Sequence, residues 1–367
     1  MVYLDYASST PVDEEVLKAY SKVSMEYYNN IVSVNDLGIR SKHLYSTSLG
    51  EMSKCLGVDK EEIILTNGMK ENFEVLLDII NSNRDDRNRI IISKLEIPYM
   101  YEFTKVLEEN GYKIDYVNNT KDGLIDLEDL KDLIKLDTLL VCVSAVNGEL
   151  GIRQPLKSIK QTIKKIDDNI LLFSDLSYAL GRININFKDI DIGMMVSDNS
   201  YGIKGKGIIY KKNNLLKKGD YEVDLPSLVA LSKMVEININ SLLEREKKVS
   251  ELNKIIIEKL SENKKLLFNS NKYSIPYIVN ISVMNRCTNE LVEDLNEYEI
   301  YLSNIDENSN FSTSVMAVYG DKVRSLTSLR ISLSHLISHK DIDYFLEIFN
   351  NIYCGEGVNY EKNNSND

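Results

Sequence analysis

The sequence predicts an α/β protein with a large domain built on a mostly parallel sheet and a smaller α+β domain toward the C-terminus. Over the first two hundred residues, short apolar runs alternate with amphipathic helical patterns, which is the order of elements found in α/β folds. After about residue 215 this rhythm changes to a long helical stretch followed by short strand-like runs. With 367 residues, the chain is long enough for both domains.

Buried strands are predicted where β-branched and apolar residues follow one another without alternation. Such runs are typical of parallel strands that helices cover on both faces. The first part of the chain contains four of them, at 62–66, 89–93, 138–144 and 169–174. Alternation of these strands with helices favours parallel pairing through right-handed crossovers.

Helices are predicted between these strands and in the C-terminal half. Apolar residues from Val16 to Tyr27 recur at helical spacing, and the segment 126–134 opens with acidic residues, which suit a helix N-terminus. A stretch with few helix breakers, 225–260, predicts one long helix. Strands at 277–283 and 328–332 and a last helix at 341–352 complete the smaller domain.

These patterns set the expected domain boundaries. The large domain is expected to span 14–235, and the small domain 1–13 together with 236–359. The polar tail 360–367 is expected to be disordered.

Composition narrows the possible partners and compartments. Fifty-six acidic residues against 44 Lys and Arg give a net charge of −12, which argues against nucleic acid and anionic membranes as partners. No apolar run approaches the roughly 18 residues that cross a membrane. Four dispersed cysteines and three scattered histidines predict neither disulfides nor a metal site, so we expect a cytoplasmic protein.

Several segments, in order, resemble the cysteine desulfurases (NifS/IscS-like), pyridoxal-phosphate-dependent proteins of fold type I in the class V aminotransferase superfamily. The segments that carry this resemblance are Tyr-Leu-Asp-Tyr-Ala-Ser-Ser-Thr-Pro-Val-Asp at 3–13, Glu-Ile-Ile-Leu-Thr-Asn-Gly-Met-Lys-Glu-Asn at 62–72, Asp-Gly-Leu-Ile-Asp-Leu-Glu-Asp-Leu at 122–130, Val-Asn-Gly-Glu-Leu-Gly-Ile-Arg-Gln-Pro at 146–155, Tyr-Gly-Ile-Lys-Gly-Lys-Gly at 201–207 and Ser-Leu-Arg-Ile-Ser-Leu at 328–333. The resemblance implies a seven-stranded large-domain sheet and a homodimer.

The family's reaction depends on residues that this chain has replaced. The lysine that forms the Schiff base with the cofactor follows a histidine in the family motif; the two positions are Asn199 and Asp198 here. A carboxamide cannot form that imine. The imidazole that stacks on the cofactor ring is replaced by Ile97, the phosphate-binding threonine by Lys70 and a glutamine near the ring oxygen by Tyr178.

The mobile cysteine that carries the persulfide in this family is also missing. No cysteine lies between 301 and 320, and its position aligns near Asn308. Cys354 is an alternative thiol for that role, but an idle thiol near a chain end is the simpler interpretation.

By the same resemblance, some ligand contacts remain. Asn147 would contact the ring hydroxyl, Asp175 the ring nitrogen and Arg330 a substrate carboxylate, although each can also be purely structural. Lys70 could attract an anion at a helix N-terminus or point to solvent. The Gly-Lys-Gly run at 205–207 lacks the ending of a phosphate loop.

Three functional hypotheses remain open from the sequence. The first is a non-catalytic homologue with a scaffold, regulatory or partner-binding role, for which no cofactor is expected and pyridoxal phosphate could bind only without a covalent link. The second is a pyridoxal-phosphate enzyme, acting on cysteine or another amino acid, with altered cofactor attachment. The third is binding of a different small anion or amino-acid-like ligand through Lys70 and Arg330.

Overall fold

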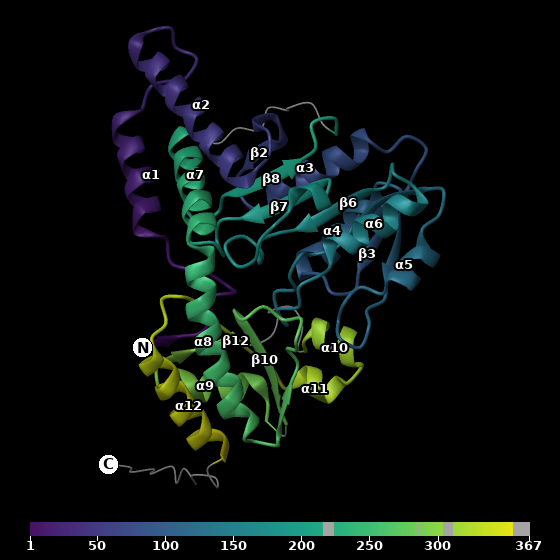
Figure 1. The fold of residues 1–367 in the computed structure, drawn as a ribbon, viewed down its shortest axis with the longest axis vertical. Helices are drawn as coiled ribbons and strands as arrows, with labels where there is room; N and C mark the ends of the chain where they lie inside the picture. The colour runs from purple at the N-terminus through teal and green to yellow at the C-terminus, as the bar shows by residue number, and fades with distance from the viewer. Residues whose placement is uncertain (216–223, 285, 304–310, 355–367) are drawn as a thin grey trace, which may run out of the picture.

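The protein is described from a computed structural model, which places residues 1–215, 224–284, 286–303 and 311–354. A seven-stranded sheet forms the centre of one lobe, and a three-stranded sheet forms the centre of the other (Figure 1). Asn308 and the tail 360–367 lie outside the described residues, so the predictions made for them stay predictions.

The large sheet has the strand order β2-β8-β7-β6-β5-β3-β4. Its members are β2 (Ile63–Thr66), β3 (Arg89–Ser93), β4 (Lys113–Val117), β5 (Thr138–Cys142), β6 (Leu171–Asp175), β7 (Ile192–Val196) and β8 (Gly207–Lys211). β8 pairs antiparallel with both of its neighbours, and every other pair is parallel. The expected mostly parallel α/β sheet is confirmed.

Helices cover both faces of this sheet because successive strand residues point to opposite sides. In β3, Ile91 faces one apolar core while Ile90 and Ile92 face the other. The first core also contains side chains of α1, α2, α5, α6 and α7, and the second contains side chains of α3 and α4. The helices are α1 (Glu14–Glu26), α2 (Asp36–Leu56), α3 (Met69–Ser82), α4 (Pro98–Glu109), α5 (Leu127–Leu133), α6 (Leu156–Ile166) and α7 (Leu225–Asn240).

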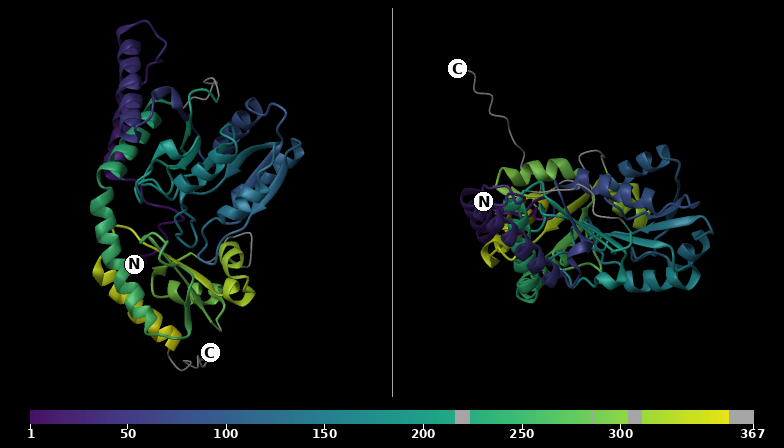
Figure 2. Two further views of the ribbon diagram at one scale, coloured as in Figure 1. Left: turned by 45° about the vertical axis from the view of Figure 1, so that its right-hand side comes forward. Right: turned by 90° about the horizontal axis from the view of Figure 1, so that it is seen from above.

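The second lobe contains a three-stranded antiparallel sheet of order β12-β10-β9. Its elements are α8 (Leu242–Ser261), β9 (Leu266–Phe268), β10 (Ile278–Val283), α9 (Thr288–Asn296), β11 (Ile300–Tyr301), α10 (Thr313–Tyr319), α11 (Lys322–Leu326), β12 (Ser328–Ser332) and α12 (His339–Cys354). The N-terminal strand β1 (Val2–Tyr3) pairs with β11, and the last helix, α12, belongs to the same lobe, so the described chain begins and ends in this lobe (Figure 2).

The long helix predicted at 225–260 is two consecutive helices, α7 and α8, which meet at Ser241. The Ser241 hydroxyl donates to the carbonyl of Ile237, a local bond that competes with the helical ladder. α7 packs against α1 and α2, whereas α8 runs along the small lobe (Figure 1). The division of the chain at 235/236 stays a prediction. Among the described residues, no helix is both long and apolar enough to cross a membrane.

Candidate functional site

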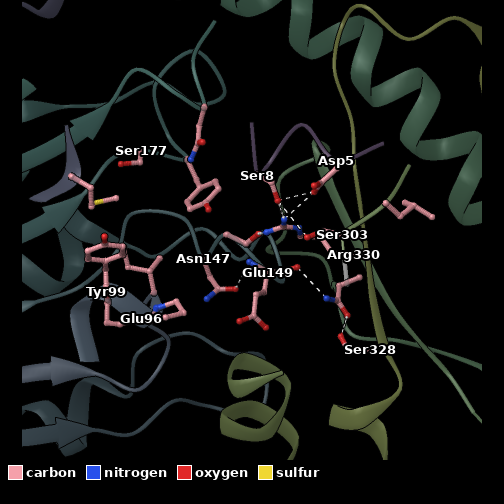
Figure 3. Close-up of a pocket in the computed structure, with 18 residues that line it drawn as sticks. Asp5, Ser8, Glu96, Tyr99, Asn147, Glu149, Ser177, Ser303, Ser328 and Arg330 are labelled. Carbon is pink, nitrogen blue, oxygen red and sulfur yellow. Dashed lines mark hydrogen bonds and ion pairs between the residues drawn. The ribbon is translucent and has the colours of Figure 1, made fainter. Parts of the chain in front are cut away.

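A cavity of about 550 Å³ lies between the two lobes, at the carboxyl ends of the parallel strands. Three residues singled out from the sequence, Asn147, Asn199 and Arg330, line it together. Asn147 and Arg330 are labelled in Figure 3. Asn147 follows β5, Asn199 lies in the turn after β7, and Arg330 comes from β12 of the small lobe. The fold therefore brings together residues that are far apart in the sequence.

Asn199 is almost completely buried, with 7% of its surface exposed. Its backbone carbonyl accepts a hydrogen bond from the Arg182 guanidinium at 2.7 Å, which fixes the turn. Among the described residues, no lysine lines the cavity. Lys204 and Lys206, the nearby lysines of the turn, are engaged elsewhere: Lys204 donates to the Thr10 and Asp198 carbonyls, and Lys206 to the Asn67 side chain.

Asn147 uses its carboxamide for contacts within the protein. Its oxygen accepts the backbone N–H groups of Glu149 and Leu150, and its nitrogen donates to the Ser314 hydroxyl at 3.0 Å. These bonds shape the 147–150 turn and hold it to α10 of the small lobe. A contact from Asn147 to a cofactor ring would have to replace one of them.

Asp175 ends β6 and is buried, and it is not among the described residues that line the cavity. One carboxylate oxygen accepts the Ser177 N–H at 2.8 Å, and the other has no hydrogen-bond partner. Burial raises the pKa of this carboxyl above its usual value. An unpartnered buried carboxylate oxygen suits a protonated ring nitrogen, so Asp175 fits the part of pyridoxal phosphate that the resemblance assigns to it.

Arg330 has a carboxylate partner within the chain. Its Nη2 lies 3.0 Å from Asp5 Oδ1 and also donates to the Ser8 hydroxyl, while Nη1 donates to the Gly148 carbonyl at 3.1 Å. Its Nε is buried and has no partner. The guanidinium predicted to hold a substrate carboxylate thus already contacts an internal one (Figure 3).

Two replaced positions change the wall of the cavity. The Tyr178 ring packs over Gly148, where an added Cβ would come within 2.4 Å of ring carbons, so only glycine fits beneath the ring. Ile97, which the resemblance aligns with the stacking imidazole, also lines the cavity. Lys70 lies outside it: its side chain is 88% exposed and is 4.0 Å from Glu74.

Sequence reasoning missed Glu96, a second buried carboxyl at this site. Glu96 lines the cavity and accepts hydrogen bonds from both the backbone and the hydroxyl of Ser144. Burial raises the pKa of Glu96 to about 8, although the Ser144 hydrogen bonds act in the opposite direction. The sequence did contain one signal for Glu96: it directly precedes Ile97, the residue that the resemblance aligns with the ring-stacking imidazole. Among the described residues, no group of three potential metal ligands is present.

Comparison with known proteins gives one consistent result. Residues 2–222 match the family model "Aminotransferase class-V". The chain is 28% identical over 370 residues to "Cysteine desulfurase IscS" of Clostridium botulinum (strain Kyoto / Type A2), covering 95% of this chain and 93% of the relative. It is 29% identical over 265 residues to "Putative cysteine desulfurase NifS" of Bacillus subtilis, covering 68% of this chain and 66% of the relative.

Solved structures agree with these matches. A "NIFS-LIKE PROTEIN" superposes with a TM-score of 0.88 at 25% identity, covering 96% of this chain and 98% of the other. A NifS-like protein from Rickettsia africae superposes with a TM-score of 0.84 at 22% identity, over 96% and 99% of the two chains, which shows the shared fold.

These comparisons correct one expectation from the sequence. The expectation that no cofactor binds is wrong for this family, because its relatives are cysteine desulfurases, for which pyridoxal phosphate is the expected cofactor. The unpartnered oxygen of Asp175 suits the ring of that cofactor, whereas Asn199, which the resemblance aligns with the attachment lysine, has a carboxamide in place of a nucleophilic amine.

Proposed function

Because the chain belongs to the aminotransferase class-V family and is cysteine desulfurase-like, we propose that it is a homologue that has lost the desulfurase reaction and acts through binding. The observation that carries this proposal is that Asn199, the residue that the sequence resemblance aligns with the Schiff-base lysine, lines the cavity. Without a primary amine there, the family's covalent step has no nucleophile at its usual place. A scaffold, regulatory or partner-binding role is consistent with that loss.

The position of the persulfide cysteine supports the same proposal from the sequence. Asn308 lies near that position and outside the described residues. Of the cysteines whose side chains the structure describes, Cys55, Cys142 and Cys287 are free, and none of them lines the cavity. Burial raises the pKa of the Cys142 thiol well above its usual value, which makes it a poor nucleophile.

The test is a sulfide-release assay with L-cysteine, pyridoxal phosphate and a reductant. We expect no sulfide above a protein-free blank, while the IscS relative, assayed in parallel, releases it. Sustained sulfide release by this chain would overturn the proposal.

One observation favours a second candidate, an enzyme with altered cofactor attachment. The unpartnered oxygen of buried Asp175 is a group that a protonated pyridine ring would satisfy. This candidate predicts turnover of an amino acid other than cysteine when pyridoxal phosphate is added. Loss of that turnover in Asp175→Asn, together with a normal melting temperature, would support it.

Assembly as a homodimer is part of the proposal. Exposed apolar side chains gather at the connection between α1 and α2, where Met25, Tyr28, Val32 and Val34 are 73 to 93% exposed. Such a patch suits burial against a second copy or another protein. Light scattering should give twice the chain mass, and a monomer at micromolar concentration would contradict this. A cytoplasmic location stays a prediction.

A further inference from the structure

Two polar groups of the cavity have no hydrogen-bond partner within the described chain. They are the carboxamide of Asn199 and the phenolic hydroxyl of Tyr178, and both residues line the cavity. Asn199 is only 7% exposed, yet neither group is closed off from the cavity as the buried Ser177 hydroxyl is. A ligand that satisfies both groups is favoured, because an unpartnered polar group in a buried site is costly.

These two groups also stand where the chain departs from the family that it resembles. The resemblance aligns Asn199 with a lysine and Tyr178 with a glutamine. Contacts that depend on the Asn199 carboxamide or the Tyr178 hydroxyl therefore differ from those of the relatives, whereas contacts of the shared segments do not.

Tyr178 is accommodated by the glycine beneath it. The ring packs over Gly148, where any side chain would collide with ring carbons. With the ring in this position the cavity still measures about 550 Å³, which is within the usual range for small-molecule sites. Burial raises the pKa of the Tyr178 phenol, so the hydroxyl keeps its proton at neutral pH and can donate it to an acceptor.

Asn199 makes this cavity poorer in positive charge than a lysine at the same position would. Arg330 is the one cation of the described lining, and its Nη2 is paired with Asp5 at 3.0 Å (Figure 3). The buried Arg182 guanidinium donates to the backbone carbonyl of Asn199 and not to its side chain. The Asn199 carboxamide oxygen therefore remains as an uncharged acceptor for a cationic donor, with the Glu149 carboxylate in the same lining.

The cofactor of this family exists in forms that differ only at the C4′ carbon. The aldehyde, pyridoxal phosphate, gains affinity from an imine with a lysine, which Asn199 cannot provide. The amine, pyridoxamine 5′-phosphate, needs no covalent bond and carries an ammonium group beside the ring oxygen. An ammonium donor and an oxygen acceptor match the Asn199 oxygen and the Tyr178 hydroxyl, and a hydrogen bond from a charged donor is about twice as strong as a neutral one.

We propose that the cleft selects the amine form of the family's cofactor and holds it without a covalent bond, with Asn199 accepting from the ammonium group and Tyr178 donating to the ring oxygen. This inference rests on the proposed function, in that it treats the cleft as a binding site that has lost the desulfurase reaction.

The experiment compares pyridoxamine 5′-phosphate with pyridoxine 5′-phosphate, its alcohol analogue, by isothermal titration calorimetry on the full-length chain. The two ligands share the ring and the phosphate, so contacts with those groups cancel in the ratio of affinities. Neither ligand condenses with a lysine. The wild type should bind the amine about tenfold more tightly than the alcohol, because only the amine donates from a charged group.

Three variants separate the contributions of the two residues. Asn199→Leu keeps a similar volume and removes the acceptor, so the two affinities should become equal within about threefold. Asn199→Lys adds a positive charge and should make the amine the weaker ligand of the two. Tyr178→Phe removes a contact to the ring oxygen that both ligands have, and it should weaken both while leaving their ratio unchanged.

Asn184→Leu is the matched control, since it removes an exposed carboxamide outside the cavity and should leave both affinities at the wild-type values. Each variant is first compared with the wild type by its melting temperature. If Asn199→Leu does not fold, Asn199→Lys and Tyr178→Phe still test the two contacts.

A wild-type preference for the amine below about threefold would overturn the proposal, because a charge-assisted bond should contribute more than that. The same conclusion would follow from a ratio that neither Asn199 variant changes, or from absence of binding of both ligands to the wild type. Sulfide release from L-cysteine is measured separately with added pyridoxal phosphate. Its appearance would overturn the loss of the desulfurase reaction, which the ratio of affinities does not measure.

Discussion

Glu96 gives the sharpest prediction of stability at the site, because its ionisation is coupled to folding. The pKa is about 8 in the folded protein and 4.5 for a solvated carboxyl. At about 1.4 kcal/mol for each tenfold change, the difference corresponds to roughly 5 kcal/mol. The folded state holds this proton more tightly than the unfolded state. The stability that protonation provides is therefore complete below pH 4.5 and is lost as the pH rises toward 8.

Glu96→Gln removes this titration while keeping an acceptor for the Ser144 hydrogen bonds. Urea unfolding at pH 5, 7 and 9 gives the free energy of unfolding of variant and wild type. The free energy of unfolding of the variant, minus that of the wild type, should increase by about 1.4 kcal/mol per pH unit between pH 5 and pH 8. Above pH 8 this difference should be constant. Differences between two otherwise identical chains cancel the titration of other groups.

Glu108→Gln is the control, because Glu108 is exposed near the end of α4 and should show no such gain. A difference between Glu96→Gln and wild type that is the same at pH 5 and pH 9 would refute the reasoning. The Glu96 carboxyl would then be solvated in the folded protein, which means that water in the cavity reaches it.

Three further predictions concern the site and the sheet that supports it. Asn199→Lys alone should release no sulfide from L-cysteine, because the other replaced positions are unchanged; turnover near that of the IscS relative would contradict this. Asp191→Asn leaves the buried Lys160 ammonium without its carboxylate and should lower the urea unfolding free energy by about 3–5 kcal/mol, whereas wild-type stability would count against the ion pair. Gly148→Ala places a Cβ within 2.4 Å of the Tyr178 ring and should lower the urea unfolding free energy by about 1–3 kcal/mol. A second change, Tyr178→Ala, should relieve this loss. Undiminished stability of the single variant would contradict the packing of the ring over Gly148.

The parts of the fold that were predictable from the sequence are those in which local pattern and tertiary environment agree. The strands at 89–93 and 138–142 are continuous apolar runs because helices cover both faces of the sheet. The two-residue strands β1 and β11 carry no such pattern, since their pairing depends on a contact between distant segments. The division of the helix at Ser241 occurs without glycine or proline, so the usual breaker signals were absent.

The positions of the site were predictable in part, since Lys70 lies outside the cavity and Glu96 was missed, and its long-range contacts were not predictable. Family resemblance located Asn147 and Arg330, which line one cavity. The distant partners of these residues do not follow from sequence spacing, because Arg330 and Asp5 are separated by 325 positions and Asn147 and Ser314 by 167. Arg182, which holds the Asn199 carbonyl from a buried position, lies in no recognisable motif. Such contacts depend on how the two lobes pack against each other.

Mass spectrometry of the intact chain after incubation with pyridoxal phosphate and borohydride tests the absence of covalent cofactor attachment most directly, since borohydride makes any imine with a lysine permanent. At one equivalent of cofactor, we expect an unmodified mass for the wild type. A stoichiometric pyridoxyl adduct that peptide mapping assigns to one lysine near the cavity, such as Lys204 or Lys206, would contradict it.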